Sequence, residues 1–247
     1  MIKILLLLFL IGHFLADFYF QSNKLAISKD HLFSKLLLHC LIYLITVIVV
    51  ILPVFSIELA FTAIIVAIVH FLIDLTKYLL KKKQIIHDKY GHATFLLDQG
   101  LHIITIVVVV GVVYRQSVPI SYTNWVDSIF GQLLSDDQLI LSWLLIILLI
   151  IKPVSILIKQ VLYNYRPSNA DESDGYPNAG ALIGVLERSI ILLLLSVNQY
   201  SAIGFVLTAK SIARYNKIAE DPKFSEYYLL GTLLSALLVI LAYVIIF

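Results

Sequence analysis

Charged residues are scarce in this sequence. They make up 14% of its 247 residues, whereas hydrophobic residues make up 60%. A soluble globular domain carries about 25% charged residues and about half apolar residues. The sequence therefore excludes an ordinary soluble domain and predicts a membrane protein with several spans. A formal net charge of +2 indicates neither a nucleic-acid partner nor an acidic substrate.

Cysteine is nearly absent, and the common catalytic signatures are missing. Cys40 is the single cysteine, so no disulfide can form within the chain, and we interpret it as a small hydrophobic residue. There is no nucleotide-binding loop, no nucleophile motif and no HExxH zinc motif. No small-residue cleavage site follows the N-terminal leucine run, so we expect that run to be a retained first span. Any chemistry must come from polar residues that lie inside apolar sequence.

Long apolar runs dominate what is present. About 20 apolar residues cross a bilayer as a helix, and this length predicts an all-α, polytopic transmembrane helix bundle of about eight helices. We expect two four-helix halves, 1–114 and 138–247, joined by an external interfacial connection over 115–137. The sixth and seventh helices are short enough to form a partly re-entrant hairpin instead. The expected helices lie at 1–20, 32–55, 57–80, 91–114, 138–163, 179–197, 199–216 and 225–247.

Lysine and arginine are concentrated on one side of these helices. Most of the 18 residues of these two types lie in loops or helix ends on the side opposite the N-terminus. The positive-inside rule therefore predicts that both termini lie outside the cytosol. We expect a multi-pass protein of the bacterial cytoplasmic (inner) membrane, with the lipid bilayer as its first partner. The sequence leaves open whether the chain forms a homo-oligomer.

A His-Phe-Leu-x-Asp pattern occurs twice inside the apolar sequence. Its copies place His13 four residues before Asp17, and His70 four residues before Asp74. Residues at this spacing lie on one face of a helix. The two copies indicate a weak internal repeat and suggest one shared polar site.

A third pair has the same spacing in reverse order, with Asp98 four residues before His102. In the predicted topology this pair, both copies of the pattern and His39 all lie in the cytosolic half of the membrane. An ionisable residue in a bilayer costs at least about 2.5–3.5 kcal/mol, so it normally faces the bundle interior and has partners there. The shared depth predicts one buried polar site near the cytosol.

Two interpretations of this site remain open. Imidazole and carboxylate groups at this spacing can bind one divalent ion, and the mixture suits zinc, manganese, iron or nickel better than calcium. Alternatively, the residues form a structural polar network in which Asp17 pairs with Lys35. Asp74 would then pair with Lys77 or His39, and Asp98 with a neighbouring histidine. On the metal interpretation the predicted ligands are His70, Asp74, Asp98 and His102, the catalytic or second-ion residues are His13 and Asp17, and the supporting hydrogen-bond partners are Gln21, His39 and Gln99.

A second polar cluster lies in the C-terminal half. Glu187 and Arg188 are adjacent near the middle of the sixth helix, where neighbours point about 100° apart, so each needs a partner elsewhere. We expect Glu187 to pair with Lys210, and Arg214 to pair with Glu226. The cluster is either an architectural salt-bridge network or a substrate-binding site for a phosphate or carboxylate.

These polar residues also resemble those of a known family. The sequence is similar to the bacterial integral-membrane family called domain of unknown function 3307 over roughly its first 125 residues, and to longer members of that family further on. The family name implies a membrane location and the same choice of site residues, but no activity. The residues that carry the resemblance are Gly12-His13-x-x-x-Asp17-x-x-x-Gln21, Lys24, His70-x-x-x-Asp74, Lys77, Asp98-Gln99-x-x-His102, Gly184-x-x-Glu187-Arg188, Ala209-Lys210-Ser211 and Glu226-Tyr227-x-x-x-Gly231-Thr232.

Three functions compete on this evidence. The first is a metal-dependent hydrolase, in which a divalent ion activates water against a phosphoester on a small-molecule or lipid-linked substrate. The second is a transporter or channel for an ion or small anion, which charges within the membrane and parallel repeats favour. The third is a membrane signalling or scaffold protein, which the short cytosolic loops disfavour.

Overall fold

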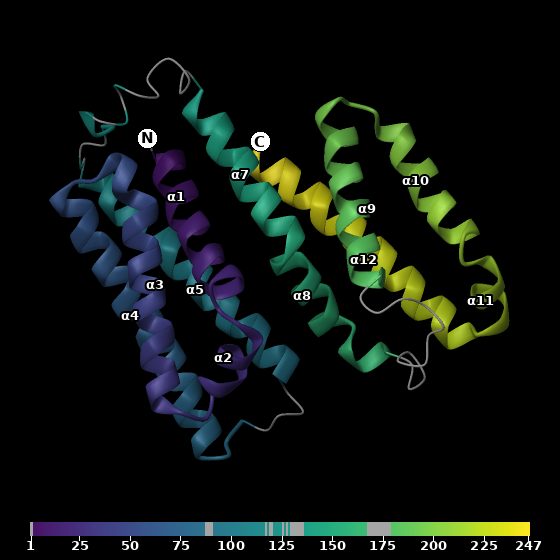
Figure 1. Ribbon diagram of the computed structural model, residues 1–247, viewed down its shortest axis with the longest axis horizontal. Coiled ribbons are helices and arrows are strands. Elements are labelled where there is room, and N and C mark those ends of the chain that lie inside the picture. The colour runs from purple at the N-terminus through teal and green to yellow at the C-terminus, as the bar shows by residue number, and fades with distance from the viewer. Residues whose placement is uncertain are drawn as a thin grey trace. The chain divides into compact units, whose positions relative to one another are not determined.

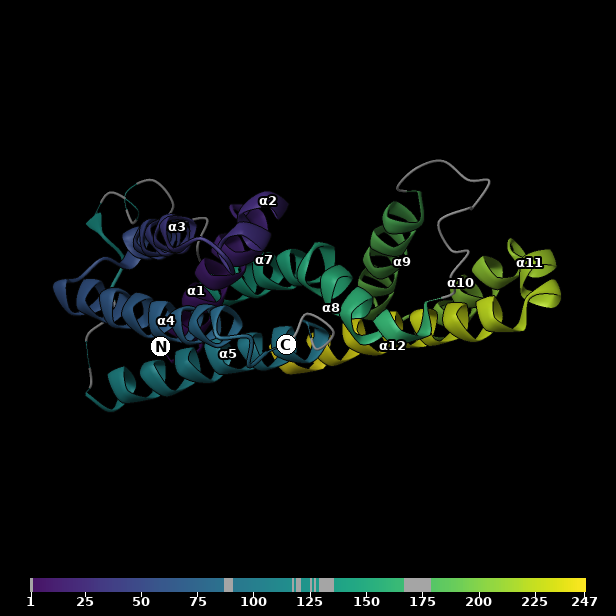
Figure 2. The same cartoon turned by 90° about the horizontal axis from the view of Figure 1, so that it is seen from below.

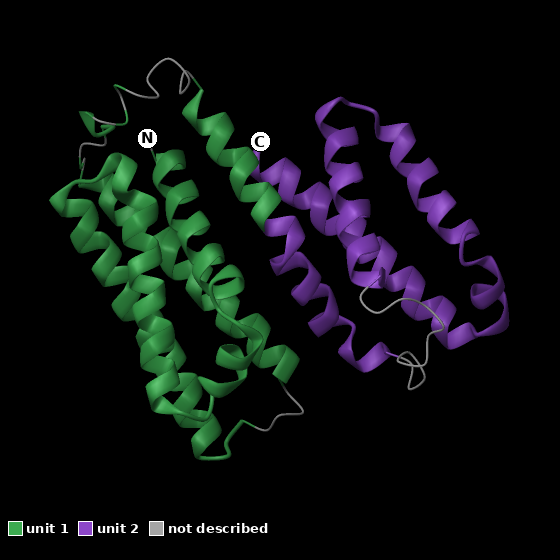
Figure 3. Cartoon of the chain, viewed as in Figure 1, with its two compact units in different colours: residues 1–148 green, residues 149–247 purple. Residues whose placement is uncertain are grey.

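The computed structural model describes residues 2–86, 91–116, 118, 121–124, 126, 128, 136–166 and 179–247. Helices account for the regular structure of these residues, and no strand occurs among them (Figure 1). The all-α prediction is confirmed. The chain divides into two compact units, residues 1–148 and 149–247 (Figure 3). The connection expected over 115–137 lies partly outside the described residues.

Seven helical segments of the described chain are long and apolar enough to cross a membrane. The protein is therefore a polytopic membrane protein, as the composition predicts. The spans are α1 (Ile2–Phe14) with the π-helical turn η1 (Leu15–Tyr19), α3 (Phe33–Ile51) with η2 (Leu52–Val54), α4 (Ile57–Lys82), α5 (Gly91–Arg115), α7 (Asp137–Ile151) with α8 (Pro153–Val161), α9 (Ala179–Ser196) and α12 (Pro222–Ile246). The shorter helices are α2 (Asn23–Ser28), η4 (Tyr163–Tyr165), α10 (Tyr200–Ile212) and α11 (Tyr215–Glu220).

The seventh expected helix, over 199–216, is shorter than predicted. It is the 13-residue helix α10, which at about 1.5 Å per residue falls short of the roughly 30 Å hydrocarbon core. Asn198 adopts a positive φ of 57° in the turn before it, a conformation that asparagine tolerates better than most residues. α10 packs back against α9, so these two helices form the hairpin that the sequence allowed.

Unit 1 is built on a bundle of α1, α3, α4 and α5. α1 packs against α3 and α5, and α4 packs against the same two helices. Figure 2 shows α4 running between α3 and α5. Inward residues such as Phe9 and Val47 are fully buried, while equally apolar residues such as Leu41 and Phe61 are exposed. Helices that are hydrophobic on both faces are typical of membrane spans.

Gly12 lies where α1 and α3 approach each other closely. A Cβ atom at this position would lie 3.3 Å from Val47 Cγ2 and 3.4 Å from Val47 Cα. We therefore expect Gly12→Leu to lower stability by about 1–3 kcal/mol through overpacking. The matched control is Gly111→Leu, because a Cβ at Gly111 meets nothing within 4 Å. Thermal unfolding in detergent measures both, and equal losses would contradict a close approach that is specific to Gly12.

Unit 2 contains α8 to α12. α12 packs against α8, α9 and α11, and its buried residues include Val239. Pro153 has no backbone N–H to donate and separates α7 from α8. The helices of this unit bring together the polar residues of the second predicted cluster, which is described below.

Candidate metal centre

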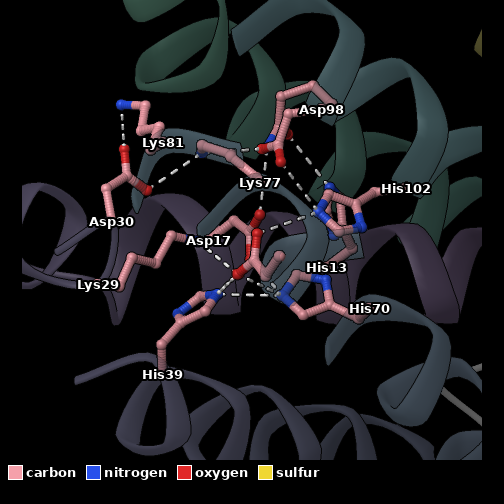
Figure 4. A network of polar contacts seen from close by, with 12 residues as sticks. His13, Asp17, Lys29, Asp30, His39, His70, Lys77, Lys81, Asp98 and His102 are labelled. Atoms are coloured by element: carbon pink, nitrogen blue, oxygen red, sulfur yellow. Dashed lines mark hydrogen bonds and ion pairs between the residues drawn. The ribbon is translucent and has the colours of Figure 1, made fainter. Parts of the chain in front are cut away.

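The helices of unit 1 bring the polar residues of the sequence repeat into one buried cluster (Figure 4). The side chains of the four histidines and three aspartates are between 0 and 6% exposed. Polar groups buried to this degree need partners, because leaving them unsatisfied costs free energy. The contributing residues are His13 on α1, Asp17 on η1, His39 on α3, His70 and Asp74 on α4, and Asp98, Gln99 and His102 on α5.

A π-helical turn positions Asp17. The backbone N–H of Phe20 donates to the carbonyl oxygen of Leu15 at 2.8 Å, which closes the wider turn of η1. Single π turns inside α-helices are rare and occur frequently at functional sites. Here the turn directs Asp17 Oδ1 towards His39 and His70, on the two neighbouring helices.

Four ligand atoms lie at distances that suit a shared ion. His39 Nε2 is hydrogen-bonded to His70 Nε2 at 3.0 Å, somewhat closer than two ligands of one ion, and lies 3.4 Å from Asp74 Oδ2. Asp17 Oδ1 lies 3.5 Å from His39 Nε2 and 3.7 Å from His70 Nε2, and His70 Nε2 lies 3.7 Å from Asp74 Oδ2. Ligands about 2.0–2.2 Å from a tetrahedral zinc ion are about 3.3–3.6 Å apart. The carboxylate–imidazole distances exceed those of hydrogen bonds, about 2.7–3.2 Å, and fit ligands of one ion better.

Each aspartate of the cluster keeps one unsatisfied oxygen. Oδ1 of Asp17, Asp74 and Asp98 is buried, and no hydrogen-bond donor reaches it from the described part of the chain. Buried polar atoms are almost always satisfied in native proteins. A cation held between these oxygens and the imidazoles would supply the missing interaction.

Asp74 is shared between two possible ion positions. Its Oδ2 faces His39 and His70, whereas its Oδ1 lies 3.7 Å from His102 Nε2. Asp98 Oδ1 lies 3.8 Å from the same His102 atom, so Asp74, Asp98 and His102 form a second group with metal-ligand geometry. One carboxylate thus lies between two sets of ligands, as in sites that hold two ions.

Two lysines balance part of the negative charge. Lys29 Nζ donates to Asp74 Oδ2 at 2.8 Å, and its side chain is 6% exposed. Burial lowers the pKa of Lys29, but the Asp74 and Asp17 carboxylates outweigh burial and raise it above its usual value. Lys77 Nζ lies 3.6 Å from Asp98 Oδ2. Three carboxylates therefore face two ammonium groups, which leaves the cluster with an excess of negative charge.

The pairings expected for a purely structural network are only partly present. Asp17 does not pair with Lys35, because Lys35 is exposed on the surface. The short helix α2 instead folds Lys29 into the cluster, which the sequence interpretation missed. Ser22 caps α2 by accepting from the backbone N–H of Leu25 at 3.2 Å, and this N-cap is the one local signal for the extra helix. The expected contact of Asp74 with His39 is present.

Gln99 connects His13 to the carboxylates. Its Oε1 lies 3.3 Å from His13 Nε2, and its Nε2 donates to Asp17 Oδ2 at 3.2 Å. Gln21 is half-buried beyond the end of η1, and within the described residues no hydrogen bond joins it to the cluster. The sequence predicts that both glutamines donate or accept hydrogen bonds that support the site, and of the two only Gln99 does so among the described residues.

Stacked rings orient the imidazoles. The Tyr43 ring stacks on His70 with centroids 3.8 Å apart, and His70 stacks on His102 at 4.1 Å. Nδ1 of His39 and Nδ1 of His70 have no hydrogen-bond partner in the described chain. Stacking therefore takes the orienting role that a hydrogen bond to the second ring nitrogen often has in metal sites.

The second predicted cluster lies in unit 2. The expected ion pair between Glu187 and Lys210 is present. Arg188 donates from Nε to the carbonyl oxygen of Ile150 at 2.6 Å and from a terminal nitrogen to Ser155 Oγ. The other expected pair, Arg214 with Glu226, is wrong. Both side chains are exposed, and among the described residues no ion pair joins them.

The family assignment follows from one comparison. The model of the family described as "Protein of unknown function (DUF3307)" matches residues 5–130, about half of the chain. The chain belongs to the DUF3307 family. The DUF3307 match covers α1 to α5, and so includes every residue of the buried His/Asp cluster. No curated protein and no solved structure matches the chain. DUF3307 membership confirms the resemblance seen in the N-terminal motifs and brings no activity with it.

Proposed function

We propose that this DUF3307 protein is an integral-membrane metalloenzyme that hydrolyses a phosphoester on a small-molecule or lipid-linked substrate. The observation that carries the proposal is the set of distances, 3.0–3.7 Å, among ligand atoms of Asp17, His39, His70 and Asp74. Two imidazole nitrogens and two carboxylate oxygens suit a divalent transition ion such as zinc, manganese, iron or nickel.

The residues divide into roles around this ion. His39, His70, Asp74 and Asp17 would hold it, so His39 becomes a ligand and not only a hydrogen-bond partner. Asp98 and His102 would hold a second ion together with the free oxygen of Asp74. Divalent ions supply Lewis-acid chemistry: they polarise a phosphoryl oxygen and activate water, and paired ions do this about 3.5–4 Å apart.

The remaining residues manage charge and protons. Lys29 and Lys77 offset two of the three carboxylate charges, so one divalent ion more than neutralises the cluster. A second ion therefore needs an anionic ligand such as a substrate phosphate, which links its binding to the presence of substrate. His13 would accept the proton of the attacking water at Nδ1, because its Nε2 donates to Gln99 Oε1 while Gln99 in turn donates to the Asp17 carboxylate.

A second function, transport of the metal ion itself, is favoured by the burial of the site. The seven ionisable side chains are at most 6% exposed, so an ion bound there is enclosed by protein. Charged residues inside a membrane often mark ion pathways. Transport requires only that the ion be released to each side in turn, whereas hydrolysis requires that a substrate reach the cluster.

Purified protein in liposomes tests both functions. We expect the metal-loaded protein to release phosphate from a phosphoester probe such as p-nitrophenyl phosphate, and Asp98→Asn to lower the rate by about 100-fold. The matched control is Glu58→Gln, which removes an exposed carboxylate at the start of α4. Metal entry into the liposomes is measured in parallel with a trapped fluorescent indicator.

The outcomes separate the two functions. Phosphate release that Asp98→Asn abolishes, without metal entry, supports the hydrolase. Metal entry without phosphate release overturns the hydrolase and supports transport. If the protein holds metal but shows neither activity, both functions are wrong for this centre.

A further inference from the structure

Unit 2 contains a cavity of about 1020 Å³ between α8, α9, α10, α11 and α12. Its volume is several times larger than a phosphate ion requires, and lies at the upper end of the range typical of ligand pockets. The cavity is bounded by residues of unit 2 alone, so it is separate from the His/Asp cluster of unit 1. It is therefore a candidate binding site in its own right.

Cationic side chains dominate the charge of this cavity. Among the described residues that line it, the one carboxylate is Glu187, and Lys210 already neutralises that group. Such an excess of positive charge favours an anionic ligand, because a phosphate can accept several charge-assisted hydrogen bonds from lysine and arginine. The cationic residues that line the cavity are Lys159, Arg166, Arg188, Lys210, Arg214 and Lys217.

The cationic side chains that line the cavity differ in burial and in their contacts. Arg188 is buried and donates to Ile150 and Ser155, so it holds α9 against α8. A Cβ at Gly184 would lie 3.3 Å from an Arg188 terminal nitrogen, so the glycine leaves room for this guanidinium. Arg188 and the pair of Glu187 with Lys210 are thus mainly architectural.

Lys159 and Arg214 are different, because they are exposed and, within the described residues, no acidic group lies within ion-pair distance of either. They are available to an incoming anion. Ser235 also lines the cavity, is 4% exposed, and its Oγ has no hydrogen-bond partner in the described chain. A buried hydroxyl without a protein partner can donate to a polar group of a ligand at this wall.

Apolar side chains complete the lining. They include Ile158 and Ile212, each within two residues of a lining cation on its helix, and also Leu162 and Phe224. A wall that is partly cationic and partly apolar matches a phosphate joined to a hydrocarbon better than a free inorganic ion. We propose that this cavity binds a phosphate-bearing ligand, with Lys159 and Arg214 contacting the phosphate and the apolar wall contacting an attached hydrocarbon chain.

Titration of the detergent-solubilised full chain tests this proposal. The probes are dioctanoyl phosphatidic acid, dioctanoyl phosphatidylcholine, dioctanoylglycerol and inorganic phosphate. We expect the phosphatidic acid to bind at least about tenfold more tightly than the other lipids. Every titration contains a chelator, so a result here is independent of the proposed metal-dependent function.

A double variant identifies the residues involved. Lys159→Gln with Arg214→Gln is expected to weaken phosphatidic acid binding at least about tenfold, whereas Lys159→Arg with Arg214→Lys keeps the charge and is expected to retain binding. The matched control is Lys83→Gln with Lys223→Gln, which removes the same charge from exposed positions that do not line the cavity. The thermal midpoint of each variant reports whether it folds.

The outcomes of these titrations either support the proposal or overturn part of it. Equal binding of phosphatidic acid and inorganic phosphate assigns the site to free phosphate and removes the hydrocarbon from the proposal. Equal binding of phosphatidic acid and dioctanoylglycerol overturns recognition of the phosphate. An equal loss in the control variant also overturns the proposal, because it would show that general surface charge, and not this cavity, attracts the lipid.

Discussion

His39→Ala combined with His70→Ala is expected to remove transition metal from the purified protein. These residues supply both imidazole nitrogens of the first ion position, and their Nε2 atoms are 3.0 Å apart. The carboxylates that remain are oxygen ligands, which suit magnesium or calcium better than zinc or nickel. We expect metal affinity to fall at least about 100-fold, since loss of a group that merely supports a ligand already costs about 10–100-fold.

Elemental analysis of the detergent-purified protein measures this effect for zinc, manganese, iron and nickel. His31→Ala is the matched control, because His31 is an exposed imidazole outside the cluster. His102→Ala separates the two ion positions: it leaves the ligands of the first intact and is expected to keep one ion. If natural and double-variant proteins are both metal-free and equally stable, the cluster is a structural polar network and the hydrolase proposal fails.

Much of this cluster was predictable from spacing alone. His70 and Asp74 must share a helix face because they are four residues apart, and the bilayer penalises exposing either of them. The same argument applied to Asp98 and His102, and the predicted topology brought both pairs to one depth. Spacing within a helix thus identified the helices that carry the site and the direction in which their polar faces point.

Contacts between helices were less predictable. His39 has no carboxylate four residues away, so spacing predicts only a supporting role for it, although it contacts His70 on the next helix. Lys29 was expected in an ordinary loop, because nothing local shows that α2 turns it inward. The π turn at η1 likewise depends on packing, since its sequence fits an α-helix equally well.

The limits of the fold prediction have a similar cause. Hydrophobic length found all seven long spans, because the bilayer sets a minimum length for each. The same rule overestimated α10, because the predicted range 199–216 also included Gln199, Arg214 and Asn216, which lie outside the 13-residue helix. Composition indicates whether a segment is apolar enough to lie in lipid, whereas the residues at which a helix ends depend on local turns such as the one at Asn198.

Asp74→Leu is expected to produce the largest loss of stability in the metal-free protein. Lys29 Nζ donates to Asp74 Oδ2 at 2.8 Å, and both side chains are almost completely buried. Removing one partner of a buried ion pair leaves the other charge without compensation and typically costs about 3–5 kcal/mol. Asp74 is the largest cause that raises the pKa of Lys29, so the variant keeps burial, which lowers that pKa, and it loses stability whether Lys29 stays charged without a partner or gives up its proton.

Adding Lys29→Met to Asp74→Leu is expected to recover most of this stability, because a buried ion pair can be replaced by packed apolar groups at little cost. Lys35→Met, which changes an exposed lysine nearby, is expected to alter stability by no more than about 0.5 kcal/mol. Denaturant titration in detergent with a chelator measures all the variants. A double variant as unstable as Asp74→Leu alone would show that the loss of stability does not come from leaving the Lys29 ammonium without its partner. Recovery would instead show that the loss of stability in Asp74→Leu comes from leaving the buried charge of Lys29 without its partner.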